Sequence, residues 1–313
     1  MTAEERLLMP WAVPAVPQNI PHGDMPGDKV CIDETHIKKA AVIFDAIRSS
    51  IAQSIADCGR CVISVCGGSG VGKSETASLL SYFLSEMGVG SYTLSGDNYP
   101  HRIPADNDAE RMRVYRHGGL RGLVGSGIEP APYRAELLSL WEDDKDADPA
   151  VCETYPWMKA YQKAGRCRLA EYLGSNQEIN FDEINDLVAR FKQGQESLYL
   201  KRMGRVCEDI WYEKMDMSGV QVLIIEWTHG NSDHYQGVDI PVLLNSTPTE
   251  TLAHRRARNR DGKTDSPFTT MVLAIEQGML EAQAHKARLI LSKSGEVLTY
   301  AQYRKLMAEE EKA

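Results

Sequence analysis

The chain has 313 residues and carries 35 lysines and arginines against 44 aspartates and glutamates, so its formal net charge is −9. This acidic balance argues against a protein that holds nucleic acid on a broad basic surface. No apolar run approaches the length of a membrane span, and the acidic N-terminus lacks the apolar core of a secretion signal, so we expect a cytoplasmic protein without a membrane partner.

The N-terminal segment, residues 1–34, is rich in proline. Five prolines fall between residues 10 and 30, which is typical of an extended arm that is either disordered or laid across the body of the protein. A helix is predicted over 35–57, because its apolar residues recur at helical spacing, and Gly59 is placed to end it.

A strand, a loop, a helix and a second strand follow in order. The first strand is the apolar run 61–66, the helix covers about 73–87, and the second strand covers 91–95. Elements of these lengths in this order form a βαβ unit, which implies a parallel sheet. We interpret 35–102 as the first part of an α/β core.

The middle of the chain has a different composition. Five of the ten residues 118–127 are glycine, and helical patterns follow over 133–142, 156–173 and 181–193. We interpret 103–206 as an insertion in the core that is built mainly of helices and forms the substrate region.

The core pattern resumes over 207–313. Apolar strands are predicted over 220–226 and 239–245. A helix over about 269–287, a strand over about 288–292 and a charged C-terminal helix complete the predicted elements.

Residues 67–74 read GGSGVGKS and match G-x-x-x-x-G-K-[ST], the phosphate-binding loop. Glycines let backbone N–H groups turn inward around an anion, and the positive end of the following helix points at the same place. Lys73 would contact the β- and γ-phosphates, and the Ser74 hydroxyl would bind Mg²⁺. The predicted nucleotide-binding residues are Gly68, Ser69, Gly70, Val71, Gly72, Lys73, Ser74 and Glu75.

This motif lies between an apolar strand and an amphipathic helix, which is the context that it requires. The sequence therefore predicts an α/β fold of the P-loop NTPase class, similar to nucleotide kinases, with a parallel sheet and helices on both faces. The mainly helical insertion and a C-terminal lid over about 254–268 complete the predicted architecture.

Two carboxylates follow apolar strands. Asp97 comes after the second strand and Glu226 closes the run VLIIE. Ligands of open parallel sheets bind beyond the carboxyl ends of the strands, so both side chains are candidates for a Mg²⁺ contact or a catalytic base. The alternatives are a turn or helix-capping role for Asp97 and a solvated strand end for Glu226.

The order of these motifs resembles the phosphoribulokinase/uridine kinase family. The phosphate loop is followed by SGDNYPHR, then VLIIE, then DIPVLLN with an arginine-rich segment. The resemblance covers about 60–100 and 181–292. It implies that Asp97 takes the proton from the acceptor hydroxyl and that Tyr99, His101 and Arg102 contact the substrate.

The same resemblance extends to the segment SLYLKRMGR, which would face the substrate with Tyr199, Lys201 and Arg202. The chain departs from the family after Glu226, where Trp227 replaces the usual glycine. His229, two residues further on, is a candidate substrate contact or a structural loop residue.

A basic cluster, HRRARNR over 254–260, resembles the start of a lid. In the family, lid arginines close over the triphosphate, and the planar guanidinium suits phosphate oxygens. Arg256 and Arg260 are four residues apart and share one helix face, so we predict that these two act in catalysis. The alternative is a solvated basic helix face.

These features predict an ATP-dependent kinase that uses Mg²⁺ and transfers the γ-phosphoryl group to a hydroxyl of a small molecule. The acceptor classes left open are a nucleoside, a sugar or sugar phosphate, and a hydroxy acid. The alternative is a P-loop NTPase that hydrolyses ATP or GTP as a switch or as a coupled ATPase, although the Asn-Lys-x-Asp base reader of a GTPase is missing from the sequence. The products separate these functions: a kinase consumes ATP in equal amount with a phosphorylated acceptor, whereas an NTPase releases free phosphate. The oligomeric state stays open, with a homodimer as one outcome.

Overall fold

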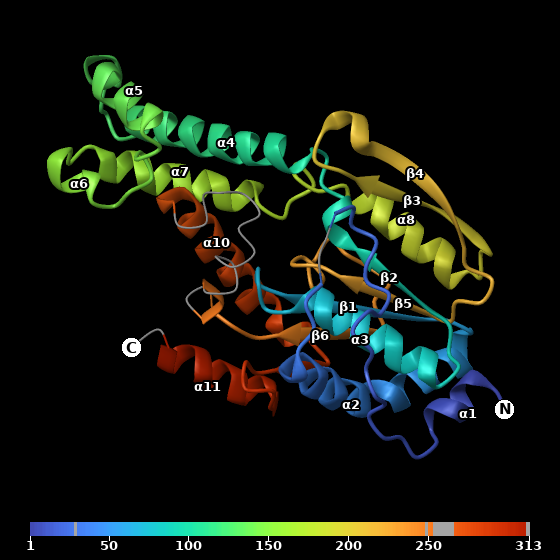
Figure 1. Cartoon of the computed structure of the whole chain (residues 1–313). Coiled ribbons are helices and arrows are strands. Elements are labelled where there is room, and N and C mark those ends of the chain that lie inside the picture. The colour runs from blue at the N-terminus through green and yellow to red at the C-terminus, as the bar shows by residue number, and fades with distance from the viewer. Residues whose placement is uncertain (28–29, 248–249, 253–265, 311–313) are drawn as a thin grey trace. The chain divides into compact units, whose positions relative to one another are not determined.

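A computed structural model describes residues 1–27, 30–247, 250–252 and 266–310 (Figure 1). The described residues fall into two compact units. The first contains 1–99, 180–251 and 280–313, and the second contains 100–179 and 252–279, in each case apart from the residues outside the description. Among the described helices, none is both long and apolar enough to cross a bilayer.

The first unit is built on a six-stranded sheet with the strand order β2-β5-β1-β6-β7-β8. The first five strands run parallel, and β8 pairs antiparallel with β7. The strands are β1 (Cys61–Gly67), β2 (Ser91–Ser95), β5 (Val222–Glu226), β6 (Ile240–Leu244), β7 (Leu289–Leu291) and β8 (Val297–Leu298). The predicted α/β fold of the P-loop class is therefore confirmed, and its central strands are continuous apolar runs because both faces are covered.

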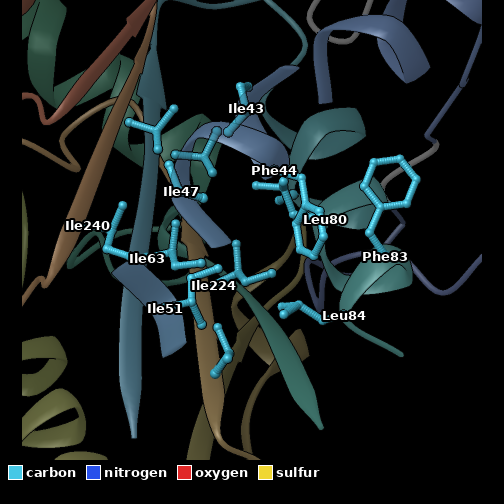
Figure 2. Close-up of a cluster of buried hydrophobic side chains, with 14 of the residues drawn as sticks. Ile43, Phe44, Ile47, Ile51, Ile63, Leu80, Phe83, Leu84, Ile224 and Ile240 are labelled. Atoms are coloured by element: carbon cyan, nitrogen blue, oxygen red, sulfur yellow. The ribbon is translucent and has the colours of Figure 1, made fainter. Parts of the chain in front are cut away.

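One face of the sheet is covered by α2 (Glu34–Cys58) and α3 (Lys73–Glu86). The Asp33 carboxylate caps α2 by accepting from the His36 N–H at 3.0 Å, and Gly59 ends the helix with φ 74°. Figure 2 shows the apolar cluster that these helices form with the strands, which includes Ile43, Phe44, Ile47, Ile51, Ile63, Leu80, Phe83, Leu84, Ile224 and Ile240. A second cluster joins β6 and β7 to the end of α10 (Pro267–Gln283) and to α11 (Tyr300–Glu310).

The N-terminal segment lies along this unit. Its first residues form a short helix, α1 (Ala3–Leu7), capped by Thr2, where the sequence predicts an extended chain. Trp11 then packs its ring 4.8 Å from Phe44 and 5.4 Å from Phe83, measured between ring centroids. Of the two arrangements left open by the sequence, the structure has the arm laid on the body, because its few large apolar side chains extend the core.

The segment from Asn180 to Asp216 belongs to the first unit. It contains α8 (Phe181–Lys192) and an antiparallel hairpin of β3 (Ser197–Met203) and β4 (Ile210–Asp216). The sequence predicts a helix over 181–193 within the mainly helical insertion, which α8 matches, whereas the hairpin that begins at 197 was not predicted. At the start of β3, Leu198 and Leu200 are buried and Tyr199 between them is exposed, as expected when successive side chains of a strand point to opposite faces.

The second unit is helical. It contains α4 (Pro104–Gly125), α5 (Arg134–Glu142), α6 (Val151–Thr154), α7 (Met158–Tyr172) and the first part of α10. Tyr115 and Tyr161 meet edge to face with ring centroids 5.7 Å apart, and Phe268 of α10 packs 5.6 Å from Tyr115. These aromatic residues belong to a hydrophobic cluster separate from that of the first unit.

Candidate active site

The phosphate loop leads from the end of β1 into the first turn of α3. Gly67, Gly70 and Gly72 all have positive φ, at 154°, 79° and 98°. A Cβ atom on Gly67 would lie 2.6 Å from the Leu244 carbonyl oxygen, so only glycine fits this approach to β6. Gly72 caps α3 without a side-chain hydrogen bond, which leaves the N–H groups of the helix start available to an anion.

Lys73 begins α3 and folds back over the loop. Its Nζ donates to the Gly68 carbonyl oxygen at 3.1 Å, and its side chain is half-buried. Of the other predicted residues, Ser69 is exposed in the loop, and Glu75 is buried in the first turn of α3. The predicted nucleotide-binding residues are thus brought together in one turn.

Glu226 ends β5 between the ends of β1 and β2. Its register partners are Val65 on β1 and Ser95 on β2. The Ser95 hydroxyl donates to Glu226 Oε1 at 2.5 Å, and the Ser74 hydroxyl donates to Oε2 at 3.3 Å. The structure therefore brings Ser74 of the phosphate loop and Glu226 together, although they are separated by 152 positions.

The Glu226 side chain is buried, with 4% of the residue exposed. Burial raises the pKa of its carboxyl to about 7, and the negative charge of Asp97 adds to this rise, while Lys73 opposes it. A buried carboxyl whose pKa is raised and which hydrogen-bonds a phosphate-loop serine is a candidate for a functional role.

Asp97 lies in the single turn Gly96–Asn98 that follows β2, and it is exposed. The indole ring of Trp227 packs directly against this turn, because a Cβ atom on Gly96 would lie only 2.1 Å from Trp227 Cγ. Trp227 itself is buried and meets the His229 ring edge to face at 5.4 Å. The residue that departs from the family pattern is therefore packed under the turn that carries Asp97, and His229 is packed against it.

Oxygen donors at this site suit Mg²⁺. Ser74 supplies a hydroxyl and Glu226 a carboxylate, and Mg²⁺ is usually held by one or two carboxylates together with substrate phosphates and water. In the described part of the chain, no group of three or more His, Cys, Asp or Glu side chains is arranged to hold a metal ion.

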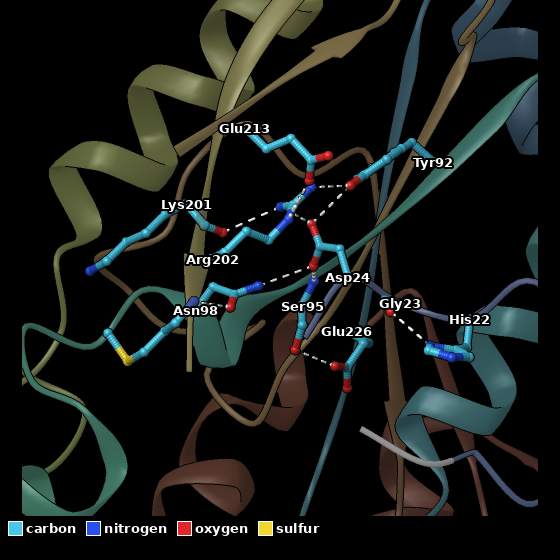
Figure 3. Close-up of polar contacts among 11 residues, drawn as sticks. His22, Gly23, Asp24, Tyr92, Ser95, Asn98, Lys201, Arg202, Glu213 and Glu226 are labelled. Carbon is cyan, nitrogen blue, oxygen red and sulfur yellow. Dashed lines mark hydrogen bonds and ion pairs between the residues drawn. The ribbon is translucent and has the colours of Figure 1, made fainter. Parts of the chain in front are cut away.

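A second polar cluster adjoins Ser95 and centres on Asp24 of the N-terminal arm (Figure 3). Asp24 Oδ1 accepts from the Ser95 N–H at 2.8 Å and from Asn98 Nδ2 at 3.1 Å. Its Oδ2 accepts from Arg202 Nη1 at 2.7 Å and from the Tyr92 hydroxyl at 3.0 Å. Burial raises the pKa of the Asp24 carboxyl, against the effects of the Ser95 N–H and the Arg202 charge.

Asp24 was missed by the sequence analysis. It lies in a proline-rich segment without a motif or a period, and only the path of the arm brings it to the strand ends. Asn98 was missed as well, although it is buried and also accepts from the Met203 N–H at 2.9 Å. Its position directly after Asp97 at a strand end was the signal that the sequence offered.

The remaining predicted substrate residues have different surroundings. Tyr99 is buried, and this burial raises the pKa of its phenol above its ordinary range. Tyr199 is 67% exposed on β3, whereas Lys201 and Arg202 of the same strand are buried. Burial lowers the pKa of the Lys201 ammonium.

His101 and Arg102 belong to the second unit. His101 Nε2 lies 3.0 Å from the Asn176 carbonyl oxygen, and Arg102 Nη1 donates to the Tyr172 hydroxyl at 3.1 Å. The lid arginines Arg256 and Arg260 lie outside the described residues, as does most of the predicted lid.

No protein-family model matches the chain. The chain is 38% identical over 263 residues to the bifunctional alpha-galactosidase/sucrose kinase AgaSK of Mediterraneibacter gnavus. The matched region covers 84% of this chain and 23% of AgaSK. It is also 32% identical over 127 residues to an adenylyl-sulfate kinase of Enterobacter, and this match covers 34% of this chain and 63% of the relative.

Two solved structures are similar at 14% identity. One, provisionally assigned as a fructose transport system kinase from Silicibacter, has a TM-score of 0.43 and covers 72% of this chain and 85% of its own. The other, a possible uridine kinase from Bacillus stearothermophilus, has a TM-score of 0.42 and covers 79% and 98%. In sequence, the chain spans about a quarter of the length of AgaSK.

Proposed function

We propose that this protein is an ATP-dependent kinase that phosphorylates a hydroxyl of a small, uncharged sugar, with Asp97 as the general base. One observation carries the proposal: the phosphate loop, the Ser74–Glu226 pair and Asp97 meet at the carboxyl ends of the adjacent strands β1, β5 and β2. Phosphoryl transfer depends mostly on positioning and on neutralising charge, and these groups supply both.

The phosphate loop binds the triphosphate. The open N–H groups at the start of α3 face the phosphates, and Lys73 leaves the Gly68 carbonyl oxygen to contact them. Ser74 and Glu226 are the residues that would hold Mg²⁺, which when bound neutralises part of the charge on the β- and γ-phosphates. Glu226 loses its proton to take this role, because Mg²⁺ binds the carboxylate form.

Asp97 accepts the proton of the acceptor hydroxyl as its oxygen forms a bond to the γ-phosphorus. The bond between this phosphorus and the β–γ bridging oxygen breaks, and ADP leaves. The exposed position of Asp97, close enough to influence the pKa of Glu226, gives an acceptor access to both the base and the triphosphate.

The class of acceptor follows from the partners of Arg202. This arginine, which the family resemblance assigns to the acceptor, is already paired with Asp24 at 2.7 Å and with Glu213 at 3.1 Å. Its charge is therefore matched within the chain, which favours an acceptor without a phosphate or carboxylate group. The similarity to AgaSK, a sucrose kinase, supports a neutral sugar.

The test is an assay of the full chain with Mg·ATP and a panel of sucrose, other neutral sugars, sugar monophosphates and nucleosides. ADP release and the mass of each acceptor are measured together. We expect a neutral sugar to gain one phosphate, with ADP formed in equal amount. ADP formed with free phosphate and no modified acceptor would instead support the hydrolytic alternative.

A further inference from the structure

We infer that the groove between α4 and α7 in the second unit is a binding site for a small molecule that carries two or more phosphate groups. The groove has a volume of about 830 Å³, and its lining comes from α4, α7 and Ser126 directly after α4. None of these residues belongs to the phosphate loop or to the Asp24 cluster. The two helices lie side by side in Figure 1.

Small residues form the floor of this groove. A Cβ atom on Gly122 would lie 2.1 Å from the Cβ of Ala164, and one on Gly118 would lie 2.6 Å from the Cβ of Arg168. The backbones of α4 and α7 therefore approach closely, and the longer side chains on either side rise as two walls. This explains the shape of the groove but does not by itself identify a ligand.

The charge of the walls points to the ligand. Five lysines or arginines and one histidine line the groove, against a single acidic residue, Glu171. The basic lining residues are Arg113, His117, Arg121, Lys159, Lys163 and Arg168. On α4 they are four residues apart and so share one helix face, and the same spacing relates the two lysines of α7.

Several of these charges are not balanced within the unit. Arg113 pairs with Glu110 at 2.6 Å and Arg168 pairs with Glu171 at 2.9 Å. Arg121, Lys159 and Lys163 are exposed, and in the described part of the chain no carboxylate lies within ion-pair distance of them. Like charges at this spacing repel, so an anion placed between the walls would stabilise the helix pair.

The size of the groove favours a small molecule over a nucleic acid. Its volume is in the range of ordinary small-molecule sites, about 300 to 1,000 Å³. Arg113 and Arg121 are separated by eight residues of helix, which corresponds to about 12 Å along the axis. This length suits phosphate groups at the two ends of one metabolite. Nucleic acid would require an extended basic face, whereas the chain as a whole carries a net charge of −9.

Calorimetric titration of the full chain tests this site, with saturating Mg·ADP present to occupy the phosphate loop. The probes are fructose 1,6-bisphosphate and inorganic tripolyphosphate, which distinguish an organic from an inorganic source of the phosphates. We expect at least one probe to bind, and its affinity to fall steeply as salt is raised from 50 to 200 mM, on the order of tenfold or more.

Variants locate the binding. The double variant Arg121→Gln with Lys163→Gln should weaken the bound probe at least tenfold, and Lys159→Gln alone should weaken it less. The matched control is Arg166→Gln, because Arg166 is an exposed cation of α7 outside the lining, and it should leave affinity within twofold. Circular dichroism confirms that each variant is folded.

The inference is overturned if neither probe binds, or if the double variant and Arg166→Gln bind equally well. It is also overturned if a single-stranded oligonucleotide of 20 residues displaces both probes at a lower concentration than either probe requires.

Discussion

Arg202 of β3 donates a 2.7 Å hydrogen bond to Asp24, a residue that precedes it by 178 positions. Both side chains are buried, so the pair closes the N-terminal arm onto the hairpin beside the ends of β2 and β5. Two functions converge in this contact. It anchors a segment that has little secondary structure of its own, and it neutralises Arg202, which the family resemblance assigns to the acceptor.

Replacing Asp24 tests both functions. Asp24→Asn leaves the buried Arg202 without its closest counter-charge, and we expect a loss of about 3 kcal/mol in the free energy of unfolding, measured with urea. We also expect the ratio of kcat/KM for a sugar phosphate to that for the neutral sugar to rise about tenfold, because the freed guanidinium attracts phosphate.

The control for Asp24→Asn is Asp45→Asn, which removes an exposed ion pair with Arg48 on α2. It should cost less than about 1 kcal/mol and leave the acceptor preference unchanged. Equal losses in the two variants would contradict a special role for the Asp24–Arg202 pair.

Asp97→Asn should lower kcat by on the order of 10²–10⁴-fold, the usual contribution of a general base. Binding of Mg·ATP, followed by calorimetry, should stay near normal because Asp97 lies outside the phosphate loop. An Asp97→Asn enzyme that phosphorylates its acceptor at the ordinary rate would refute the assignment of the base.

Lys73→Ala should abolish turnover and weaken ATP binding together, since it removes the cation that faces the β- and γ-phosphates. The free energy of unfolding should change little, because among the described residues the half-buried side chain makes one hydrogen bond, to the Gly68 carbonyl oxygen. Retained phosphotransfer in this variant would show that residues 67–74 are a structural turn.

The pH dependence of stability reports on Glu226. Its pKa is raised to about 7 in the folded chain, above the ordinary value of 4.5, so the folded state binds the proton more tightly than the unfolded state. The stabilising contribution of this proton is fully present below pH 4.5 and is lost as the pH rises to about 7.

Glu226→Gln removes this dependence. When the pH rises from 5 to 8, the free energy of unfolding of the natural chain should fall by on the order of 2 kcal/mol more than that of the variant, measured by urea unfolding at both pH values.

In the natural chain, the Mg²⁺ concentration needed for half-maximal activity should rise as the pH falls below 7, because the metal competes with the proton for Glu226. A requirement that is constant from pH 6 to pH 8 would argue against Glu226 as a ligand.

Gly96→Ala tests the support that Trp227 gives to the Asp97 turn. The added methyl group would overlap the indole ring, so we expect a loss of about 1–3 kcal/mol and a lower kcat. Gly125→Ala is the matched control, because nothing lies within 4 Å of its Cβ position. Similar behaviour of the two variants would mean that the turn tolerates displacement of Trp227.

Local sequence patterns were sufficient to predict much of the α/β core. The strands around Ile63 and Ile224 are short apolar runs, and the phosphate loop is a motif whose glycines are required by backbone geometry within eight residues. Asp97 and Glu226 were placed correctly at strand ends because the carboxyl ends of parallel strands share one edge of the sheet.

Other features depended on partners that are distant in the sequence. The helix α4 continues through Gly118 and Gly122, residues of low helix propensity, because their lack of a side chain lets α7 approach. The hairpin over 197–216 was not predicted, since a seven-residue run does not by itself reveal the strand with which it pairs.

The sequence by itself determined the P-loop fold class, the position of the phosphate loop after the first core strand and the two carboxylates at the strand ends, because each depends on a local pattern. Only the tertiary structure decided that Asp24 neutralises Arg202, that Trp227 supports the Asp97 turn, and that six basic residues of α4 and α7 face one groove. These relationships arise where the folded chain brings separate segments together, and burial then sets the energy of each charge.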